Sequence, residues 1–297
     1  MKISTFFIVL TFVTTITSEK FNSREDLSAF NYHNRIGIPL AAKIKRIEED
    51  AARTGQRIVG GVVTDISRVP YQAGLVIQFP WFTSVCGGSL ISNTRVITAA
   101  HCQWDGNINA VYHTVVLGSN TVFSGGVRRP TSDVVMHPRW NVNTLANDIA
   151  VMRIAHVGYT SVIQPIALPS GNELTQTFAG QIGLASGFGF TRDGKISVNI
   201  PIITNVECRA YFGPFAHATN ICTSAAGGKG TCHGDSGGPL AVQSSGRAIL
   251  VSIVNEKSYL LTDNKQNDVT VLVHCSLDIT TNITVPSAVT ENALLKH

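Results

Sequence analysis

Three short stretches of the sequence carry side chains that together can perform nucleophilic acyl transfer. His101 follows an apolar run, Asp148 begins another, and Ser236 stands in a glycine-rich turn, GDSGGP. A serine hydroxyl becomes a good nucleophile when an imidazole, which ionises near neutral pH, takes its proton. A carboxylate holds that imidazole in one tautomer and stabilises its cation. Glycines beside the serine let backbone N–H groups approach a developing oxyanion. These residue types therefore predict a hydrolase that works through a nucleophilic serine.

The elements that must position these residues are short β-strands. Apolar and β-branched runs separated by Gly, Pro, Asn and Asp predict strands near residues 73–79, 95–98, 111–117, 149–154, 181–186, 196–203, 239–242 and 248–254. This spacing is typical of an all-β sandwich or a pair of barrels. Hydrophobic residues make up 44% of the 297 residues and charged ones 14%, which excludes a disordered polymer. The net charge is +4 and the sequence shows no cluster of basic residues, so we expect no nucleic-acid partner.

The serine turn also fits the G-x-S-x-G pattern of α/β-hydrolases, which is the first alternative. In that fold the order along the chain is serine, acid, histidine. That order would leave only His274 or His297 as the base, and it needs alternating helices that this sequence lacks. The order His101, Asp148, Ser236 in a β-rich chain favours a different fold.

The N-terminal residues differ from the rest of the chain. Residues 1–18 have a positive start, an apolar run and small polar residues, as a secretory signal peptide does. The run is shorter than the roughly 20 residues that span a bilayer. Residues 19–57 hold charged clusters and a short predicted helix over Ala41–Arg53, and we expect them to contribute little to a core. We therefore predict a secreted, extracellular protein with no membrane association after signal removal, in which disulfides can form.

From Ile58 to about Val254 the chain resembles the chymotrypsin (S1) family of serine endopeptidases. Within that family it is most similar to secreted digestive chymotrypsin-like and brachyurin-like enzymes of arthropods. Five stretches in the same order carry the resemblance: residues 57–61 (RIVGG), 86–90 (CGGSL), 98–102 (TAAHC), 147–150 (NDIA) and 230–239 (GTCHGDSGGP). The resemblance implies an all-β fold of two six-stranded antiparallel β-barrels with the active site between them.

The resemblance also implies roles for single residues. His101 would be the general base, Asp148 would orient it, and Ser236 would be the nucleophile. The N–H groups of Gly234 and Ser236 would form the oxyanion hole.

The same resemblance implies a zymogen in which residues 19–57 form an activation propeptide. A trypsin-like protease would cut after Arg57, and the freed α-amine of Ile58 would pair with Asp235. The pocket floor would be Gly230, where trypsin-like members carry Asp. A chymotrypsin-like or broad apolar preference on protein or peptide substrates would follow, by a monomeric enzyme.

The six cysteines would form disulfides if the resemblance holds. Cys86 would pair with Cys102, Cys208 with Cys222, and Cys232 with a later cysteine, for which Cys275 is the only candidate. We expect no cofactor and no metal, because the sequence has no CxxC or HExxH spacing. No acidic loop supports the calcium site of some relatives.

The C-terminal residues 255–297 depart from the family. No glycine follows Gly246, and residues 255–261 (NEKSYLL) stand where family members have the Ser-aromatic-Gly segment of the pocket wall. Two outcomes stay open: a second barrel without its last strands, or a diverged tail that still closes it. The expected organisation is thus a signal peptide (1–18), a propeptide (19–57), a protease domain (58–254) and a divergent tail (255–297). The tail also leaves open a second function, a non-catalytic or impaired protease-like binding protein.

Overall fold

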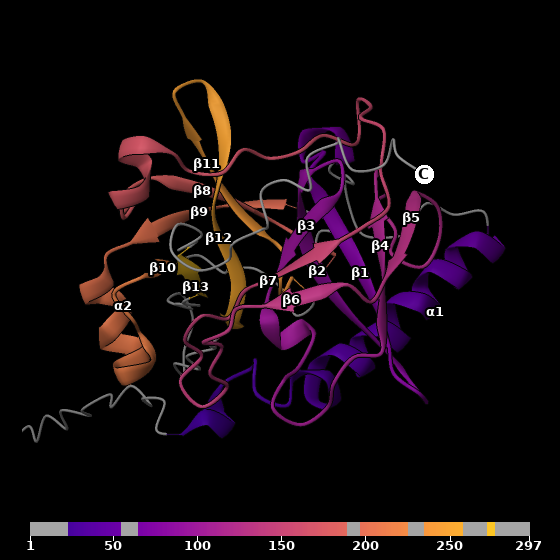
Figure 1. Cartoon of the computed structure of the whole chain (residues 1–297), viewed down its shortest axis with the longest axis horizontal. Helices are drawn as coiled ribbons and strands as arrows, with labels where there is room; N and C mark the ends of the chain where they lie inside the picture. The colour runs from indigo at the N-terminus through magenta and orange to yellow at the C-terminus, as the bar shows by residue number, and fades with distance from the viewer. Residues whose placement is uncertain (1–22, 55–64, 189–196, 225–234, 258–271, 277–297) are drawn as a thin grey trace, which may run out of the picture.

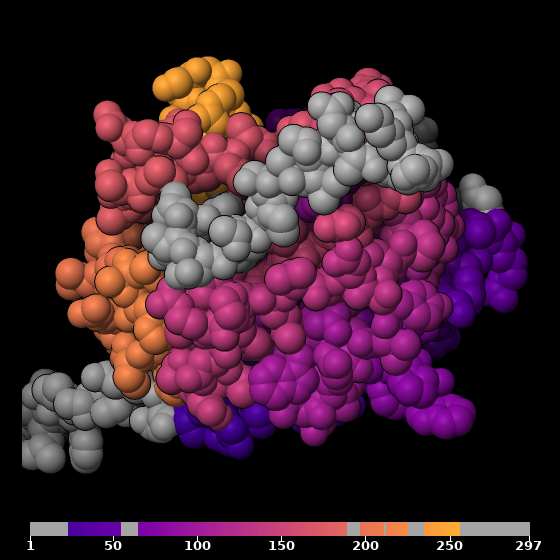
Figure 2. Space-filling view, in the orientation of Figure 1, coloured from indigo at the N-terminus to yellow at the C-terminus, as the bar shows by residue number. Residues whose placement is uncertain are grey.

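A computed structural model of the chain describes residues 23–54, 65–188, 197–224, 235–257 and 272–276. Two curled antiparallel sheets lie side by side and form one continuous body (Figures 1 and 2). The predicted all-β fold with two such sheets is confirmed.

The first sheet has seven strands, one more than expected, in the order β5-β4-β1-β2-β3-β7-β6. Their bounds are β1 (Gln72–Gln78), β2 (Thr83–Ser92), β3 (Arg95–Thr98), β4 (Tyr112–Leu117), β5 (Val127–Thr131), β6 (Val134–Met136) and β7 (Ala150–Arg153).

Side chains of β1 are buried on both faces of the sheet. Leu75 and Ile77 pack into the sheet interior, whereas Val76 faces outward and is also buried. A strand buried on both faces needs a covering layer on the outside of the sheet.

That layer is the helix α1 (Ile38–Thr54), which lies beside the first sheet, away from the second (Figure 1). Leu40, Ala41 and Ile44 pack in one cluster with Val76 of β1 and Val85 of β2. The apolar positions recur at helical spacing, which gives the helix one apolar face. The expectation that residues 19–57 contribute little to a core is therefore wrong.

The second sheet is a closed barrel in the order β10-β13-β12-β11-β8-β9. Its strands are β8 (Ile182–Ser186), β9 (Ser197–Ile203), β10 (Asn220–Thr223), β11 (Pro239–Ser244), β12 (Arg247–Lys257) and β13 (Leu272–Ser276). The strand β13 comes from the divergent tail and pairs with both β12 and β10, with Cys275 opposite Ile253 and Asn220. Of the two outcomes that the sequence left open, the structure shows a diverged tail that closes the barrel.

Short helices complete the described residues. The α-helix α2 (Asn205–Phe212) is capped by the preceding Thr204, whose side chain accepts a hydrogen bond from the Glu207 backbone. The one-turn helices are η1 (Arg24–Asp26), η3 (Ile66–Arg68), η4 (Ala100–Cys102), η5 (Gly171–Thr175) and η6 (Gly213–Phe215), and η2 (His33–Gly37) is a π-helix. No helix in the described part of the chain is both long and apolar enough to cross a membrane.

Two buried histidines, His33 and His113, lie in the first half of the molecule. Burial lowers the pKa of His33 to about 4; the charge of Asp105 opposes this shift and that of His101 adds to it. Burial, with a smaller contribution from His33, lowers the pKa of His113 to about 3. Both rings are therefore neutral in the folded protein at pH values where an unfolded chain already binds protons.

We predict that the folded state loses stability as the pH falls below about 6.5, where histidines of an unfolded chain take up protons. Between pH 7.5 and pH 5 each histidine should lower the free energy of unfolding by about 2 kcal/mol. Urea unfolding of the full chain at the two pH values measures this. The variant His113→Gln, which can keep the hydrogen bond to Gln103, should show a smaller pH dependence. Equal pH dependence in both proteins would contradict this assignment.

Candidate active site

His101 and Asp148 form a buried pair at the ends of two neighbouring strands. His101 lies in η4 directly after β3, and Asp148 precedes β7; the two strands pair with Thr98 opposite Ala150. One carboxylate oxygen of Asp148 lies 2.7 Å from His101 Nδ1, and the other accepts the backbone N–H of His101 at 2.8 Å. Both side chains have no solvent exposure. With Nδ1–H donating to the carboxylate, Nε2 keeps its lone pair and can act as a base.

Ser236 lies in a turn that joins the second barrel to the first sheet. Its carbonyl accepts the N–H of Gly87 in β2 at 2.7 Å. The same oxygen lies 3.9 Å from the sulfur of Cys102, the residue that follows His101. Ser236 is 9% exposed. The structure therefore places the serine turn next to the segment that carries His101.

The glycine after the serine allows this close approach. Gly237 has a φ of +84°, and its N–H donates to the carbonyl of Val254 in β12 at 2.7 Å. A Cβ at this position would lie 2.3 Å from Thr98 Oγ1 and 2.5 Å from the carbonyl oxygen of Gly87. Only glycine fits both the backbone conformation and the space.

Asp235, the residue before the serine, is also buried, with 6% exposure. Its carboxylate packs over Gly187, where a Cβ would lie 2.0 Å from Oδ1. A buried carboxylate in this position can respond to a cation brought next to it. Ile58, the predicted source of that cation, lies outside the described residues, as do Arg57, Gly230, Cys232 and Gly234.

Two of the predicted disulfide pairs are joined in the structure. Cys86 is bonded to Cys102, which ties β2 to the helix of His101, and Cys208 is bonded to Cys222, which ties α2 to β10. Cys275 belongs to β13, and its pairing with Cys232 stays a prediction because Cys232 is outside the described residues.

One cluster of potential metal ligands occurs among the described residues. The ligand atoms of Cys86, His101 and Cys102 lie within 4.8 Å of one another. The two sulfurs are bonded to each other, so neither is a thiolate, and thiolates are the form in which cysteine binds metals. This cluster therefore does not make a metal centre.

Sequence reasoning missed Tyr32, which contacts the predicted catalytic residues. Its ring lies edge-on to the ring of His101, with centroids 4.8 Å apart and planes at 61°. Its hydroxyl donates to the carbonyl of Val85 at 2.9 Å. Burial raises the pKa of Tyr32 far above its usual value; a side-chain hydrogen bond with Ser236 opposes this shift, and the charge of Asp235 adds to it.

The position of Tyr32 explains an unpaired atom. Nε2 of His101 is buried and makes no hydrogen bond to any described residue. Because the ring of Tyr32 packs against this imidazole, the N-terminal part of the chain contributes to its burial. No motif marks Tyr32 in the sequence; the only signal is its place just before an amphipathic helix.

Residues 58–276 match the family model described as Trypsin. The chain therefore belongs to the trypsin family of serine proteases, and the predicted family is confirmed.

The chain is similar to several arthropod proteases. It is 36% identical over 204 residues to a collagenase of Hypoderma lineatum, a match that covers 67% of this chain and 76% of the relative. It is 38% identical over 194 residues to brachyurin of Leptuca pugilator, covering 62% and 80% of the two chains. A solved collagenase structure matches with a TM-score of 0.62 and 32% identity, over 74% of this chain and 94% of that one.

We predict that Gly237→Ala strongly destabilises the protein, while Gly246→Ala does so only mildly. Both glycines have positive φ, a conformation that costs a residue with a Cβ about 1–2 kcal/mol. A Cβ at position 246 meets nothing within 4 Å, whereas one at 237 meets Thr98 and Gly87. Thermal unfolding of the two variants should therefore differ, with Gly237→Ala losing at least about 2 kcal/mol more. Equal losses would show that the serine turn is not packed against the first sheet.

Proposed function

We propose that the chain is a secreted serine endopeptidase made as a zymogen, which hydrolyses peptide bonds through an acyl-enzyme. The observation that carries this proposal is the buried pair of His101 and Asp148, whose Nδ1–carboxylate distance is 2.7 Å. Burial of two ionisable groups is costly, and this arrangement leaves Nε2 with the lone pair that general-base catalysis needs. The pair therefore favours the enzyme over the protease-like binding protein.

The chemistry follows from the proton positions. Asp148 holds the Nδ1–H of His101, so Nε2 accepts the proton of Ser236 as its oxygen attacks the substrate carbonyl. The N–H groups of Gly234 and Ser236 stabilise the oxyanion of the tetrahedral intermediate. His101 then protonates the leaving amine, and water completes the hydrolysis by the same route in reverse. The side chains and backbone supply every step, so no cofactor is needed.

Activation would begin with a cut after Arg57 by a trypsin-like protease. The α-ammonium of Ile58 would then pair with the carboxylate of Asp235. Because Asp235 is 6% exposed and adjoins Ser236, pairing there can order the backbone that binds the oxyanion.

The substrate preference is proposed to be chymotrypsin-like or broadly apolar. Gly230 offers no carboxylate at the expected pocket floor, so a Lys or Arg side chain of the substrate would lack a counter-ion there. The similarity to proteins named collagenase and brachyurin supports a protein substrate. The signal-like residues 1–18 and the two disulfides support secretion, and we propose that the enzyme acts as a monomer.

We predict that Ser236 is the nucleophile of the activated enzyme. In a chain whose residues 53–57 are replaced by an enteropeptidase recognition sequence, cleavage before Ile58 and removal of the N-terminal segment should allow a fluorophosphonate to label Ser236 stoichiometrically. Ser236→Ala should abolish labelling, and Asp148→Asn should lower kcat on apolar peptide esters by about 10⁴. The exposed Asp133→Asn should leave both unchanged. Turnover by Ser236→Ala at the parent rate would refute the mechanism.

We predict that activation requires Arg57 itself. Immobilised trypsin, followed by gel filtration to remove the cut segment, should convert the full chain to a form that begins at Ile58 and cleaves apolar peptide esters. Arg57→Gln should remain uncut at that bond and inactive. The matched variant Arg53→Gln removes an exposed arginine four residues earlier and should activate normally. N-terminal sequencing and ester hydrolysis measure the two properties; an active, uncut Arg57→Gln protein would contradict the switch.

A further inference from the structure

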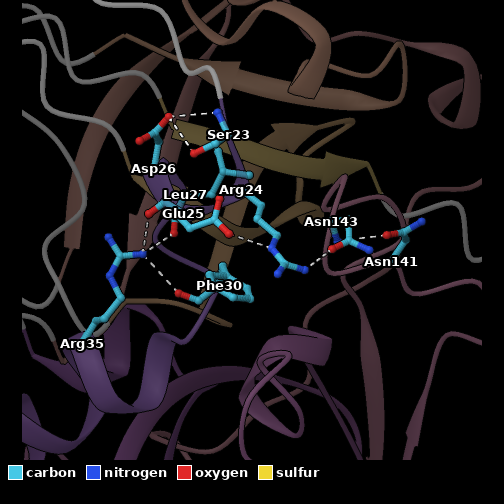
Figure 3. A network of polar contacts seen from close by, with 9 residues as sticks. All are labelled: Ser23, Arg24, Glu25, Asp26, Leu27, Phe30, Arg35, Asn141 and Asn143. Atoms are coloured by element: carbon cyan, nitrogen blue, oxygen red, sulfur yellow. Dashed lines mark hydrogen bonds and ion pairs between the residues drawn. The ribbon is translucent and has the colours of Figure 1, made fainter.

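The N-terminal segment (residues 23–54) is folded onto the protease body and not merely tethered to it. Leu27, Ala29, Tyr32 and His33 have no solvent exposure. Figure 3 shows how the start of the segment is held: the guanidinium of Arg35 donates to the carbonyls of Glu25, Leu27 and Phe30. These bonds fold the chain before η2 into a compact loop.

The same loop reaches across to the protease body. The guanidinium of Arg24 lies 4.6 Å from the centroid of the Phe30 ring and donates to the side-chain oxygen of Asn143 (Figure 3). Asn143 lies in the stretch of chain between β6 and β7, before Asp148. The N-terminal segment thus contacts the part of the first sheet that leads to the buried acid.

Around Tyr32 the segment makes polar contacts that orient it. The backbone N–H of His33 donates to Asp105 at 2.9 Å, and His33 Nδ1 lies 2.9 Å from Ser84 Oγ. The backbone N–H of Asn31 donates to the carbonyl of Asp105 at 3.0 Å. Gly37 fits against β2 so closely that a Cβ there would lie 2.0 Å from Ser84 Oγ. These contacts involve residues before and after Tyr32 in the sequence, and together they hold its ring in place.

A second anchor lies at the far end of the segment, on α1. Glu48 is 8% exposed, and its carboxylate accepts the backbone N–H groups of Val122 and Phe123 and the hydroxyl of Ser124, at 2.7 to 3.0 Å in their shortest contacts. Hydrogen bonds to a charged acceptor are stronger than neutral ones. The neighbouring Glu49 is exposed, and its contact among the described residues is a 4.0 Å ion pair with Lys45 within the helix.

Between these anchors, Tyr32 occupies the reaction site. Its ring packs edge-on against the ring of His101. Its hydroxyl donates to the carbonyl of Val85, two residues before the Gly87 N–H that binds the Ser236 carbonyl. A substrate carbonyl has to reach Ser236 at the same place. The phenol and a substrate therefore exclude each other.

Cleavage after Arg57 would not by itself remove this obstruction. Residues 19–57 contain no cysteine, so the segment has no disulfide to the protease body, and its contacts are all noncovalent. A cut would convert an intramolecular contact into a bimolecular complex, whose lifetime depends on affinity and dilution.

We propose that the N-terminal segment is a docked inhibitor of the active site, with Tyr32 as the blocking residue and Glu48 as the anchor, and that it must dissociate after cleavage. This inference rests on the proposed function, because it assigns His101 and Ser236 to the site that is blocked. The surface that it defines binds an aromatic side chain followed by an amphipathic helix.

The test uses the full chain with the enteropeptidase sequence at residues 53–57. Immediately after cleavage, the concentrated parent protein should react slowly with a fluorophosphonate, and dilution or gel filtration should raise the rate at least about tenfold. Tyr32→Ala should react fast at once at all concentrations, because loss of a fully buried aromatic ring weakens binding about 100-fold or more. Tyr112→Ala, at an exposed tyrosine of β4, should behave like the parent. Fast, concentration-independent labelling of the parent would overturn the proposal.

Retention of the cut segment on gel filtration is a second measurement that needs no catalysis. Glu48→Gln should release the segment at least about tenfold more readily than the parent, and Glu49→Gln should not. If no variant is labelled even after the segment is removed, the proposed function is wrong. In that case the retention of the cut segment still tests the docking contact, because it needs no catalysis. If Tyr32→Ala loses the segment and Tyr112→Ala keeps it, the contact is upheld. Equal retention in the two variants overturns it.

Discussion

The structure depends on the buried hydrogen-bonded pair of His101 and Asp148. One carboxylate receives both the ring and the backbone N–H of the same histidine, so it fixes the tautomer of the ring and the position of η4 together. The pairing of β3 with β7 brings the two residues into register, and neither is exposed. A buried carboxylate without partners would cost several kcal/mol, so the fold and the pair support each other. The second barrel contributes as well, since Asn255 donates to the Asp148 carbonyl at 3.4 Å.

The contact between the two sheets combines apolar packing, in which Leu250 and Ile253 join the same buried cluster as Leu75, with backbone hydrogen bonds around the serine turn. The carbonyl of Ser236 accepts from Gly87, and the N–H of Gly237 donates to Val254. Val254 is also paired with His274 in β13, the strand supplied by the divergent tail. Only β12 therefore lies between the tail strand β13 and the serine turn, although the sequence of the tail departs from the family. A change that loosens β13 is expected to disturb Ser236 before it disturbs His101.

Much of the site was predictable because its signals are local. The residue types around His101, Asp148 and Ser236 are typical of strand ends and turns. The glycine after the serine is needed because β2 approaches the turn closely. The family resemblance supplied the order and the pairings of Cys86 with Cys102 and Cys208 with Cys222. These predictions needed no knowledge of which distant segments touch.

The features that were missed depend on contacts between distant residues. Tyr32 bonds to Val85, 53 residues away, and nothing near Tyr32 in the sequence marks that partner. The charges on α1 concealed its apolar face, and one of them, Glu48, is an internal anchor instead of a solvated group. The absence of glycine after Gly246 suggested a loss of β-structure, yet β13 needs only an extended run that can pair with β12. Composition reports turns better than it reports strand partners.

The two proposed controls on activity meet at adjacent residues. The α-ammonium of Ile58 would act on Asp235, while Tyr32 packs against His101. Tyr32 also donates to the carbonyl of Val85, two residues before the Gly87 N–H that binds the Ser236 carbonyl. A shift of the Asp235 backbone cannot leave Ser236 in place, because the two share a peptide bond. Insertion of the amine into its pocket and docking of the phenol therefore affect each other's equilibrium by the same free energy. If insertion favours a serine position that Tyr32 cannot accommodate, cleavage lowers the affinity of the segment that it has just cut, and a docked segment in turn opposes insertion. Such coupling would make activation depend on concentration in a way that neither control produces alone.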